Sequence, residues 1–256
     1  MTTKQNDSVR SILVIYLEEK HRELVQSQFS DSLETSDANA LYRAFLEDTI
    51  TACLAIDSFD LAISCSAGTG ARIATEAIEN LSFCLKGKCK TRLDQDCIFR
   101  WDQPEAELSQ SLELTFKKCF EAGYDQALLI DCVTPTITHQ MLDHAQRLLR
   151  KKDVIFGPTL EGSYYLIGMR KFIPQIFTRI DWSEDEHIYS RIVEVAREDS
   201  LDWEELELWY DLRQPGDLEF LVRDINAFRI IGDEFSAKRT ETVLETLIEK
   251  FQREES

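Results

Sequence analysis

The sequence predicts an α/β protein with a mostly parallel, doubly wound central sheet flanked by helices. Short apolar runs alternate with longer segments of helical periodicity along most of the 256 residues. Several runs, such as residues 12–17, are continuously apolar, as expected of strands buried on both faces of a parallel sheet. Residues 127–168 show the pattern most clearly. There an apolar run, a helical segment and two further apolar runs follow one another, which predicts a βαβ unit at the centre of the fold.

The expected elements can be placed in chain order. Strands are expected at residues 12–17, 61–65, 97–101, 127–130, 154–156, 164–167 and 205–209. Helices are expected at residues 37–54, 71–81, 104–122, 184–197, 217–227 and 234–253, and also between the strands at 127–130 and 154–156. Asp37 and Ser183 are the expected N-terminal caps of two of these helices, and the helix that ends at Ala122 is expected to start at Pro104. The basic residues 86–90 are expected to form a turn. Residues 1–10 are expected to be a flexible tail, and residues 11–256 a single domain that ends in helices.

Composition excludes several classes of partner. The net charge of −18 argues against nucleic acid, because binding a phosphate backbone requires clustered Lys and Arg. No apolar run approaches the roughly 20 residues of a membrane span, and the polar N-terminus lacks the layout of a signal peptide. The seven cysteines are an odd number and most lie in apolar segments, as expected of reduced thiols. We therefore expect a cytoplasmic protein with no nucleic-acid or membrane partner.

Acidic residues at the ends of predicted strands are the strongest candidates for chemistry. Asp131 directly follows an apolar strand, and Glu161 and Asp211 also leave strand-like runs. Ligands lie at the carboxyl ends of strands in open α/β sheets, and Mg²⁺ bound with phosphates needs one or two carboxylates there. The alternative is that these residues only shape turns, since Asp is favoured in turns. The Gly68–Thr69–Gly70 turn resembles a phosphate-binding loop but lacks the remaining residues of the known fingerprints, so an ordinary strand-to-helix turn is the preferred interpretation.

The segment GPTLEGSYYLIG at residues 157–168 resembles a known family pattern, GPxxDGGYYLIG. It is similar to that of the bacterial glycosyltransferase-like nucleotide-diphospho-sugar transferases, also called radical-SAM/selenodomain-associated transferases. Residues 40–49, 180–183 and 211–218 resemble further segments of this family in the same order, so the resemblance covers about residues 11–225. It implies a GT-A, Rossmann-like fold.

The resemblance also implies a function. A family member would transfer a glycosyl or nucleotidyl group and would bind a nucleotide or nucleotide sugar with Mg²⁺ or Mn²⁺. The residues at or next to the family's motif positions would then be catalytic (Asp131, Glu161 and Asp211), metal-binding (Asp131 and Asp211) and nucleotide-binding (Gly162, Ser163, Tyr164 and Trp182), although Glu161 replaces an Asp and Ser163 replaces a Gly of the pattern.

The sequence departs from the family pattern where the chemistry is expected. Residues 18–27 lack the Pro, the Gly and the basic pair of the family's phosphate loop. Alignment on Pro135 places Val133 at the position of the metal-binding Asp and Asp131 two residues earlier, and Arg213 replaces a second Asp. A Val cannot bind Mg²⁺, and a loop rich in Glu repels pyrophosphate. A second hypothesis is therefore a catalytically inactive family member that serves as a binding or interaction module. The sequence leaves the oligomeric state open.

Overall fold

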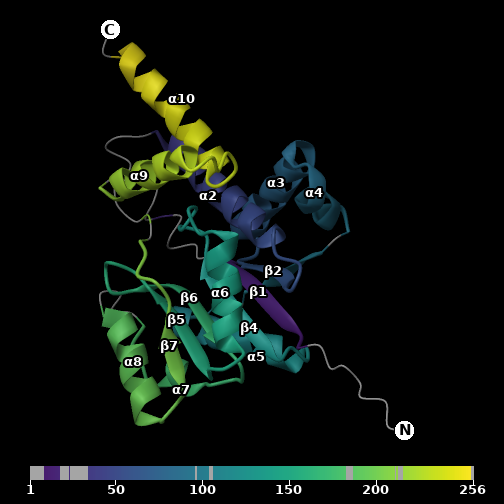
Figure 1. The fold of residues 1–256 in the computed structure, drawn as a ribbon, viewed down its shortest axis with the longest axis vertical. Coiled ribbons are helices and arrows are strands. Elements are labelled where there is room, and N and C mark those ends of the chain that lie inside the picture. The colour runs from purple at the N-terminus through teal and green to yellow at the C-terminus, as the bar shows by residue number, and fades with distance from the viewer. Residues whose placement is uncertain are drawn as a thin grey trace.

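One mixed β-sheet forms the centre of the protein (Figure 1). The computed structural model describes residues 9–17, 23, 34–95, 97–103, 106–182, 187–210, 212 and 216–254. The strand order is β3-β2-β1-β4-β6-β5-β7. The strands are β1 (Ser11–Leu17), β2 (Asp60–Cys65), β3 (Ile98–Asp102), β4 (Gln126–Asp131), β5 (Val154–Pro158), β6 (Tyr164–Met169) and β7 (Trp203–Glu205). All pairings are parallel except those of β6, which runs antiparallel to both of its neighbours. The predicted α/β fold with a mostly parallel sheet is confirmed.

Helices cover both faces of the sheet, which explains the continuously apolar strands. On β1, Leu13 and Ile15 belong to one buried cluster, whereas Ile12 and Val14 belong to another on the opposite face. The first cluster is covered by α2 (Thr35–Leu54), α3 (Thr69–Cys84), α4 (Gly87–Asp94) and α6 (His139–Leu149). The second is covered by α5 (Leu108–Glu121), α7 (Gln175–Thr178) and α8 (Ile188–Glu198).

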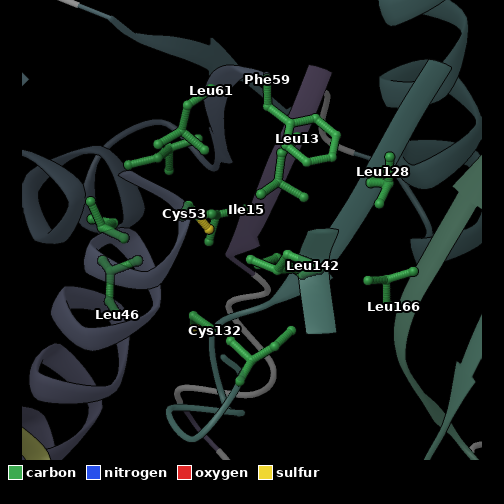
Figure 2. Packing of buried hydrophobic residues seen from close by; sticks show 14 of the residues in the cluster. Leu13, Ile15, Leu46, Cys53, Phe59, Leu61, Leu128, Cys132, Leu142 and Leu166 are labelled. Carbon is green, nitrogen blue, oxygen red and sulfur yellow. The ribbon is translucent and has the colours of Figure 1, made fainter. Parts of the chain in front are cut away.

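The first cluster joins helices and strands that are far apart in the chain (Figure 2). Leu46 and Cys53 of α2 and Leu142 of α6 come together with side chains from four strands, which are Leu13, Ile15, Leu61, Leu128 and Leu166. All of these side chains are almost completely buried. Burial of a Leu or Ile side chain stabilises a fold by about 1.5–3 kcal/mol, so this cluster is a main source of stability.

The central unit differs from the expected βαβ arrangement in one respect. β6 lies between β4 and β5 in the sheet and runs antiparallel to them, so the two parallel strands are not neighbours. The short link at residues 159–163 explains this result. A connection of that length can close a hairpin but cannot carry the chain back across the sheet to start another parallel strand.

Residues 86–90 are not a simple turn as predicted but lie largely in the helix α4. Tertiary contacts stabilise this short polar helix. Leu93 is buried in the core, and the guanidinium of Arg92 donates to the carbonyl oxygens of Cys53 (3.2 Å) and Leu54 (3.3 Å) at the end of α2. Such contacts between distant segments override the local preference of a basic sequence that contains glycine.

Other boundaries also shift. Helix α2 begins at Thr35, and the predicted cap Asp37 lies in its first turn, where its carboxylate binds Lys250 Nζ at 2.8 Å. Strand β7 occupies Trp203–Glu205 and overlaps the predicted strand at 205–209 in a single residue. The predicted start at Pro104 and cap at Ser183 fall outside the described residues, and α5 and α8 are described from Leu108 and Ile188.

Close packing explains the glycines of the GPTLEGSYYLIG motif. A Cβ at Gly157 would lie 2.4 Å from Cζ of Tyr165, and a Cβ at Gly168 would lie 2.6 Å from Cγ1 of Ile155. Gly162 has a φ of 82°, which is unfavourable for other residues. The motif is therefore required by the packing of the β5–β6 hairpin, whatever chemistry takes place nearby.

The C-terminal helices α9 (Asp217–Ile230) and α10 (Lys238–Glu254) pack on the side of α2 that faces away from the sheet (Figure 1). Asp48 of α2 fixes the start of α10. Its carboxylate, which is almost completely buried, accepts hydrogen bonds from the backbone N–H groups of Arg239 (3.2 Å) and Thr240 (2.8 Å). Burial raises the pKa of Asp48 above its ordinary value. This carboxylate therefore acts as an N-terminal cap supplied by a different helix.

We predict that Gly157→Ala destabilises the protein by about 1–3 kcal/mol, because the added methyl group overlaps the buried ring of Tyr165. Urea unfolding followed by circular dichroism measures the change. Gly216→Ala is the control, since a Cβ there meets no atom within 4 Å, and it should shift stability by less than about 0.5 kcal/mol. Equal stability of both variants would contradict the packing explanation.

We predict that Asp48→Ala destabilises the protein by about 3 kcal/mol, because it leaves the first N–H groups of α10 without their buried acceptor and the Arg239 guanidinium with Glu47 as its remaining carboxylate. Limited proteolysis should then cut first within α10. Asp57→Ala is the control, since Asp57 forms an ion pair with Lys88 at the surface. Unchanged protease resistance of Asp48→Ala would show that the other contacts of α10 hold this helix without the Asp48 cap.

Candidate active site

The carboxyl ends of the parallel strands meet at one edge of the sheet, where the candidate residues were expected. The loop after β1 lies mostly outside the described residues, so the departures at residues 18–27 stay sequence observations. Gln103, which follows β3, joins the ends of β1 and β2. Its side-chain amide donates to the carbonyl oxygens of Leu17 (3.1 Å) and Ser64 (2.9 Å), and its backbone N–H donates to Cys65 O at 2.9 Å. This edge is therefore held by side-chain hydrogen bonds beyond the end of the β-ladder.

Asp131 is the last residue of β4, as predicted, and only 7% of its surface is exposed. Its Oδ1 accepts a hydrogen bond from the backbone N–H of Val133 at 3.2 Å. This local bond is an Asx turn, which starts the β4–α6 loop (residues 132–138). Asp131 therefore shapes the loop, which is the structural role weighed against a metal-binding one.

Val133, at the position of the family's metal-binding Asp, is buried in the core. Its backbone carbonyl accepts a hydrogen bond from Leu212 N–H at 3.0 Å. The neighbouring thiol of Cys132 is also buried and donates to the hydroxyl of Tyr42 at 3.3 Å. Burial raises the pKa of Cys132 well above its ordinary value, so this thiol stays protonated and is a poor nucleophile.

Glu161 and Gly162 lie at the tip of the turn that joins β5 to β6. Thr159 closes the turn through three bonds. Its N–H donates to Ser163 O at 3.1 Å, its carbonyl accepts from Gly162 N–H at 3.1 Å, and its hydroxyl accepts from Ser163 N–H at 3.2 Å. Gly162 O accepts in turn from Tyr189 N–H at 3.0 Å. The turn that carries Glu161 is thus rigidly held, and Ser163 is buried beneath it.

Tyr164 and Trp182 belong to the hydrophobic core below this turn. Their rings pack edge to face with centroids 5.6 Å apart, and both side chains are more than 90% buried. The indole N–H of Trp182 donates to Ile176 O at 3.3 Å. These contacts give both residues a structural role, and the nucleotide-binding role suggested by the resemblance stays a prediction.

Residues 206–210 and 212, called here the crossing segment, follow β7 and run across the sheet edge. The segment first binds the β5–β6 turn. Trp209 N–H donates to Pro158 O at 3.1 Å, and Trp209 O accepts from Leu160 N–H at 3.0 Å. The hydroxyl of Tyr165 donates to Glu207 O at 3.1 Å. The crossing segment thereby extends the pairing of the sheet beyond the end of β5.

The crossing segment next binds the β4–α6 loop. The buried hydroxyl of Thr136 accepts from the indole N–H of Trp209 at 3.1 Å and shares a hydrogen bond of 2.8 Å with the hydroxyl of Tyr210. Leu212 N–H donates to Val133 O at 3.0 Å. The loop that begins at Asp131 and the turn that carries Glu161 are therefore tied to one another through this segment.

Thr136, Trp209 and Tyr210 were not among the residues predicted for the site. A local signal existed, because an aromatic pair directly before a carboxylate is unusual in an exposed loop. We instead assigned Trp209 to a strand.

The described residues contain no group of three His, Cys, Asp or Glu side chains that could hold a metal ion. Asp211 and Arg213 lie outside the described residues, although Tyr210 and Leu212, the chain neighbours of Asp211, both bind the β4–α6 loop. Among all the residues that the structure describes, no helix is long enough and apolar enough to cross a membrane.

Comparison with protein families places the chain in one of them. The sequence profile described as "Uncharacterized protein conserved in bacteria (DUF2064)" matches residues 49–184, which is more than half of the chain. The chain belongs to the DUF2064 family. Comparison of this DUF2064 protein with the curated proteins found no match.

Solved structures share the fold over nearly the whole chain. A protein from Desulfovibrio desulfuricans G20, whose proposed activity is nucleotide-diphospho-sugar transferase, has a TM-score of 0.73 and 24% identity, covering 95% of this chain and 98% of that one. A cytidylyltransferase from Leptospira borgpetersenii has a TM-score of 0.56 and 11% identity, covering 93% and 94%. CMP:2-keto-3-deoxy-manno-octonic acid synthetase, complexed with CTP, has a TM-score of 0.52 and 10% identity, covering 86% and 99%. At these identities the likeness establishes the GT-A-like fold of this DUF2064 protein and leaves its activity open.

We predict that Thr136→Val destabilises the protein by about 1–3 kcal/mol, because it leaves the Trp209 N–H and the Tyr210 hydroxyl without their buried partner. Hydrogen exchange should rise at Trp209 and Leu212, whose N–H groups bind the flanking loops. Thr178→Val is the control, since Thr178 is exposed and its hydroxyl donates to Pro174 O, one helical turn earlier in the chain, at 3.2 Å. Unchanged exchange at both positions would show that Thr136 does not hold the crossing segment.

Proposed function

We propose that this DUF2064 protein binds a nucleotide or nucleotide sugar, together with Mg²⁺ or Mn²⁺, at the carboxyl edge of its sheet and transfers a glycosyl or nucleotidyl group. In this proposal Asp131, Glu161 and Asp211 form the catalytic and metal-binding set. Gly162 and Ser163 contact the nucleotide. Tyr164 and Trp182 act on the same site from the core, by supporting the turn that carries Gly162.

The crossing segment is the observation that carries the proposal. Asp131 and Glu161 leave different strands, and a ligand site at a sheet edge needs such loops to be held in a constant relation. Trp209 supplies that link, because its indole N–H binds the loop after Asp131 and its backbone binds the turn around Glu161. A pre-organised edge of this kind is expected where a ligand is positioned.

The shared fold adds support. One structure with this fold has a proposed nucleotide-diphospho-sugar transferase activity, one is a cytidylyltransferase, and one contains CTP. Because all are less than 25% identical to this chain, they support nucleotides as the first ligands to test and do not identify the substrate.

The carboxylate groups of the proposed site would suit a hard divalent cation. Mg²⁺ is bound by one or two carboxylates, with water and substrate phosphates completing its shell. Asp131 with Asp211 or Glu161 would supply these carboxylate oxygens. The ion would neutralise phosphate charge that this chain, with a net charge of −18, would otherwise repel.

The remaining roles follow from the positions of the protein's own groups. The Asx turn at Asp131 sets the direction of the β4–α6 loop. The bonds of Thr159 to Gly162 and Ser163 hold the β5–β6 turn in place. A substrate bound at both loops would be oriented by groups in fixed positions, so that substrate positioning makes a large contribution to the rate.

One observation favours the alternative, a catalytically inactive member that only binds its ligand. Val133, at the position of the family's metal-binding Asp, is committed to the hydrophobic core and cannot serve as a ligand. The two proposals differ in turnover and agree on nucleotide binding, so they can be separated by experiment.

Binding can be measured by thermal shift and calorimetry with nucleoside di- and triphosphates and their sugars, each with and without Mg²⁺ or Mn²⁺. A ligand present at 100 times its dissociation constant should stabilise the folded protein by about 2.7 kcal/mol. Stabilisation by none of these ligands would refute the proposal. Binding without release of pyrophosphate, nucleotide or sugar, when phosphate-bearing and hydroxyl-bearing acceptors are also supplied, would assign the inactive binding module.

We predict that Asp131→Asn abolishes the metal-dependent part of binding and leaves the fold intact, because the Asn oxygen can still accept the Val133 N–H. Asp143→Asn is the control, since Asp143 lies on α6 and pairs with Arg147 at the protein surface. Equal nucleotide affinity of Asp131→Asn and the unchanged protein, in the presence of the metal, would refute the metal-binding role of Asp131.

A further inference from the structure

A groove of about 730 Å³ lies over α2 and reaches the β4–α6 loop at Pro135 and Ile137, whereas Asp131 and Glu161 are not among its lining residues. Helices α3 and α4 lie on one side of α2 and helices α9 and α10 on the other (Figure 1). The walls come from the end of α3 and the start of α4, around Leu85, and from the start of α10, around Val243. Binding sites for small organic ligands are typically clefts of about 300–1,000 Å³, so this groove has the size of a ligand site.

Small side chains keep the floor of the groove open. Ala40, Ala44 and Ala52 of α2 line the groove, as does Ala55 just after the end of this helix. Further apolar lining residues are Leu85, Pro135, Ile137, Phe235, Ala237 and Val243, and polar side chains lie between them. The groove therefore suits a ligand with an apolar body.

The acidic groups of the groove are already occupied by the protein. Glu47 accepts from Asn80 Nδ2 at 3.0 Å and pairs with Arg239 Nε at 3.3 Å. Asp48 accepts the backbone N–H groups of Arg239 and Thr240. Arg239 is in turn held by these two carboxylates, so this buried cluster is balanced internally.

Two cationic side chains that line the groove form only long ion pairs or none with the described residues. The guanidinium of Arg43 approaches its carboxylate neighbours, Glu47 and Glu76, only at 3.8 and 3.9 Å. Lys86 is exposed and forms no hydrogen bond or ion pair with any residue that the structure describes. In a chain with a net charge of −18, two available cations beside one apolar groove are a specific local feature, and they favour an anionic group on the ligand.

We propose that this groove binds a small amphipathic anion, with its apolar body over the alanines of α2 and its carboxylate or phosphate group at Arg43 and Lys86. The site goes beyond the proposed nucleotide site and does not depend on it. Pro135 and Ile137 line the groove and also belong to the β4–α6 loop. A bound ligand would therefore contact the loop that starts at Asp131.

The probes are decanoate, decyl phosphate, decanol and inorganic phosphate, titrated calorimetrically into the full-length protein below the micelle concentration. We expect one molecule of decanoate or decyl phosphate to bind per chain, decanol to bind at least about tenfold more weakly, and inorganic phosphate not to bind. The tighter of the two anions identifies the head group as a carboxylate or a phosphate. Equal affinity for decanol and both anions, or binding of neither anion, would refute the proposal.

Charge variants test the position of the head group. Arg43→Gln and Lys86→Gln should each weaken binding of the preferred anion by about tenfold, which corresponds to about 1.4 kcal/mol, and should leave decanol binding unchanged. Arg191→Gln and Lys117→Gln each remove one charge outside the groove and should have no effect. Equal weakening by all four substitutions would show a general charge effect and overturn the assignment.

Ala52→Phe tests the position of the apolar body, because it adds a ring to the groove floor and should abolish binding. If this variant does not fold, the charge variants still decide the question. Nucleotide-induced stabilisation measured in the same variants separates the two sites. If the sheet-edge site binds nucleotides, this stabilisation should persist in Arg43→Gln and Lys86→Gln. If nucleotides stabilise neither the unchanged protein nor any variant, only the nucleotide proposal is refuted.

Discussion

The central sheet of this protein is buried on both faces, and the other features depend on that constraint. Strands such as β1 are apolar over nearly their whole length, because alternate side chains enter two different cores. Polar side chains that could act on a ligand are therefore rare in the middle of the sheet. They gather in the loops at its carboxyl edge, and the crossing segment binds those loops together through Trp209 and Tyr210, which both bond to Thr136 of the β4–α6 loop.

The fold could be predicted to a large extent because its signals are local. Continuous apolar runs mark β1, β2 and β4, and helical periodicity marks α2 and α3. The errors occurred where distant contacts decide the structure. Helix α4 depends on Arg92 reaching the end of α2, and the loop after Asp131 depends on a bond between Thr136 and Trp209, which are 73 residues apart. No sequence pattern at either position reports its partner.

For the candidate site, positions in the chain could likewise be predicted from local signals, whereas the role of a residue such as Trp182 could not. Asp131 was correctly expected at the end of a strand, and the structure adds that its carboxylate shapes the following loop. Val133 was expected not to bind a metal, and it lies in the core. For Trp182 a motif match alone could not distinguish a residue that contacts a ligand from one that supports the site, because both roles favour the same aromatic side chain. Burial and the bond to Ile176 describe the supporting role.

The glycines at 157 and 168 have a consequence for recognising active relatives. Their positions leave no room for a methyl group, since a Cβ would overlap Tyr165 in one case and Ile155 in the other. Selection for folding alone would retain these glycines in a lineage that had lost its catalytic carboxylates. A search built on this motif would therefore collect working enzymes and their inactive descendants together. Sorting the two groups calls for the residues of the β4–α6 loop, where a Val can replace an Asp without disturbing the hairpin.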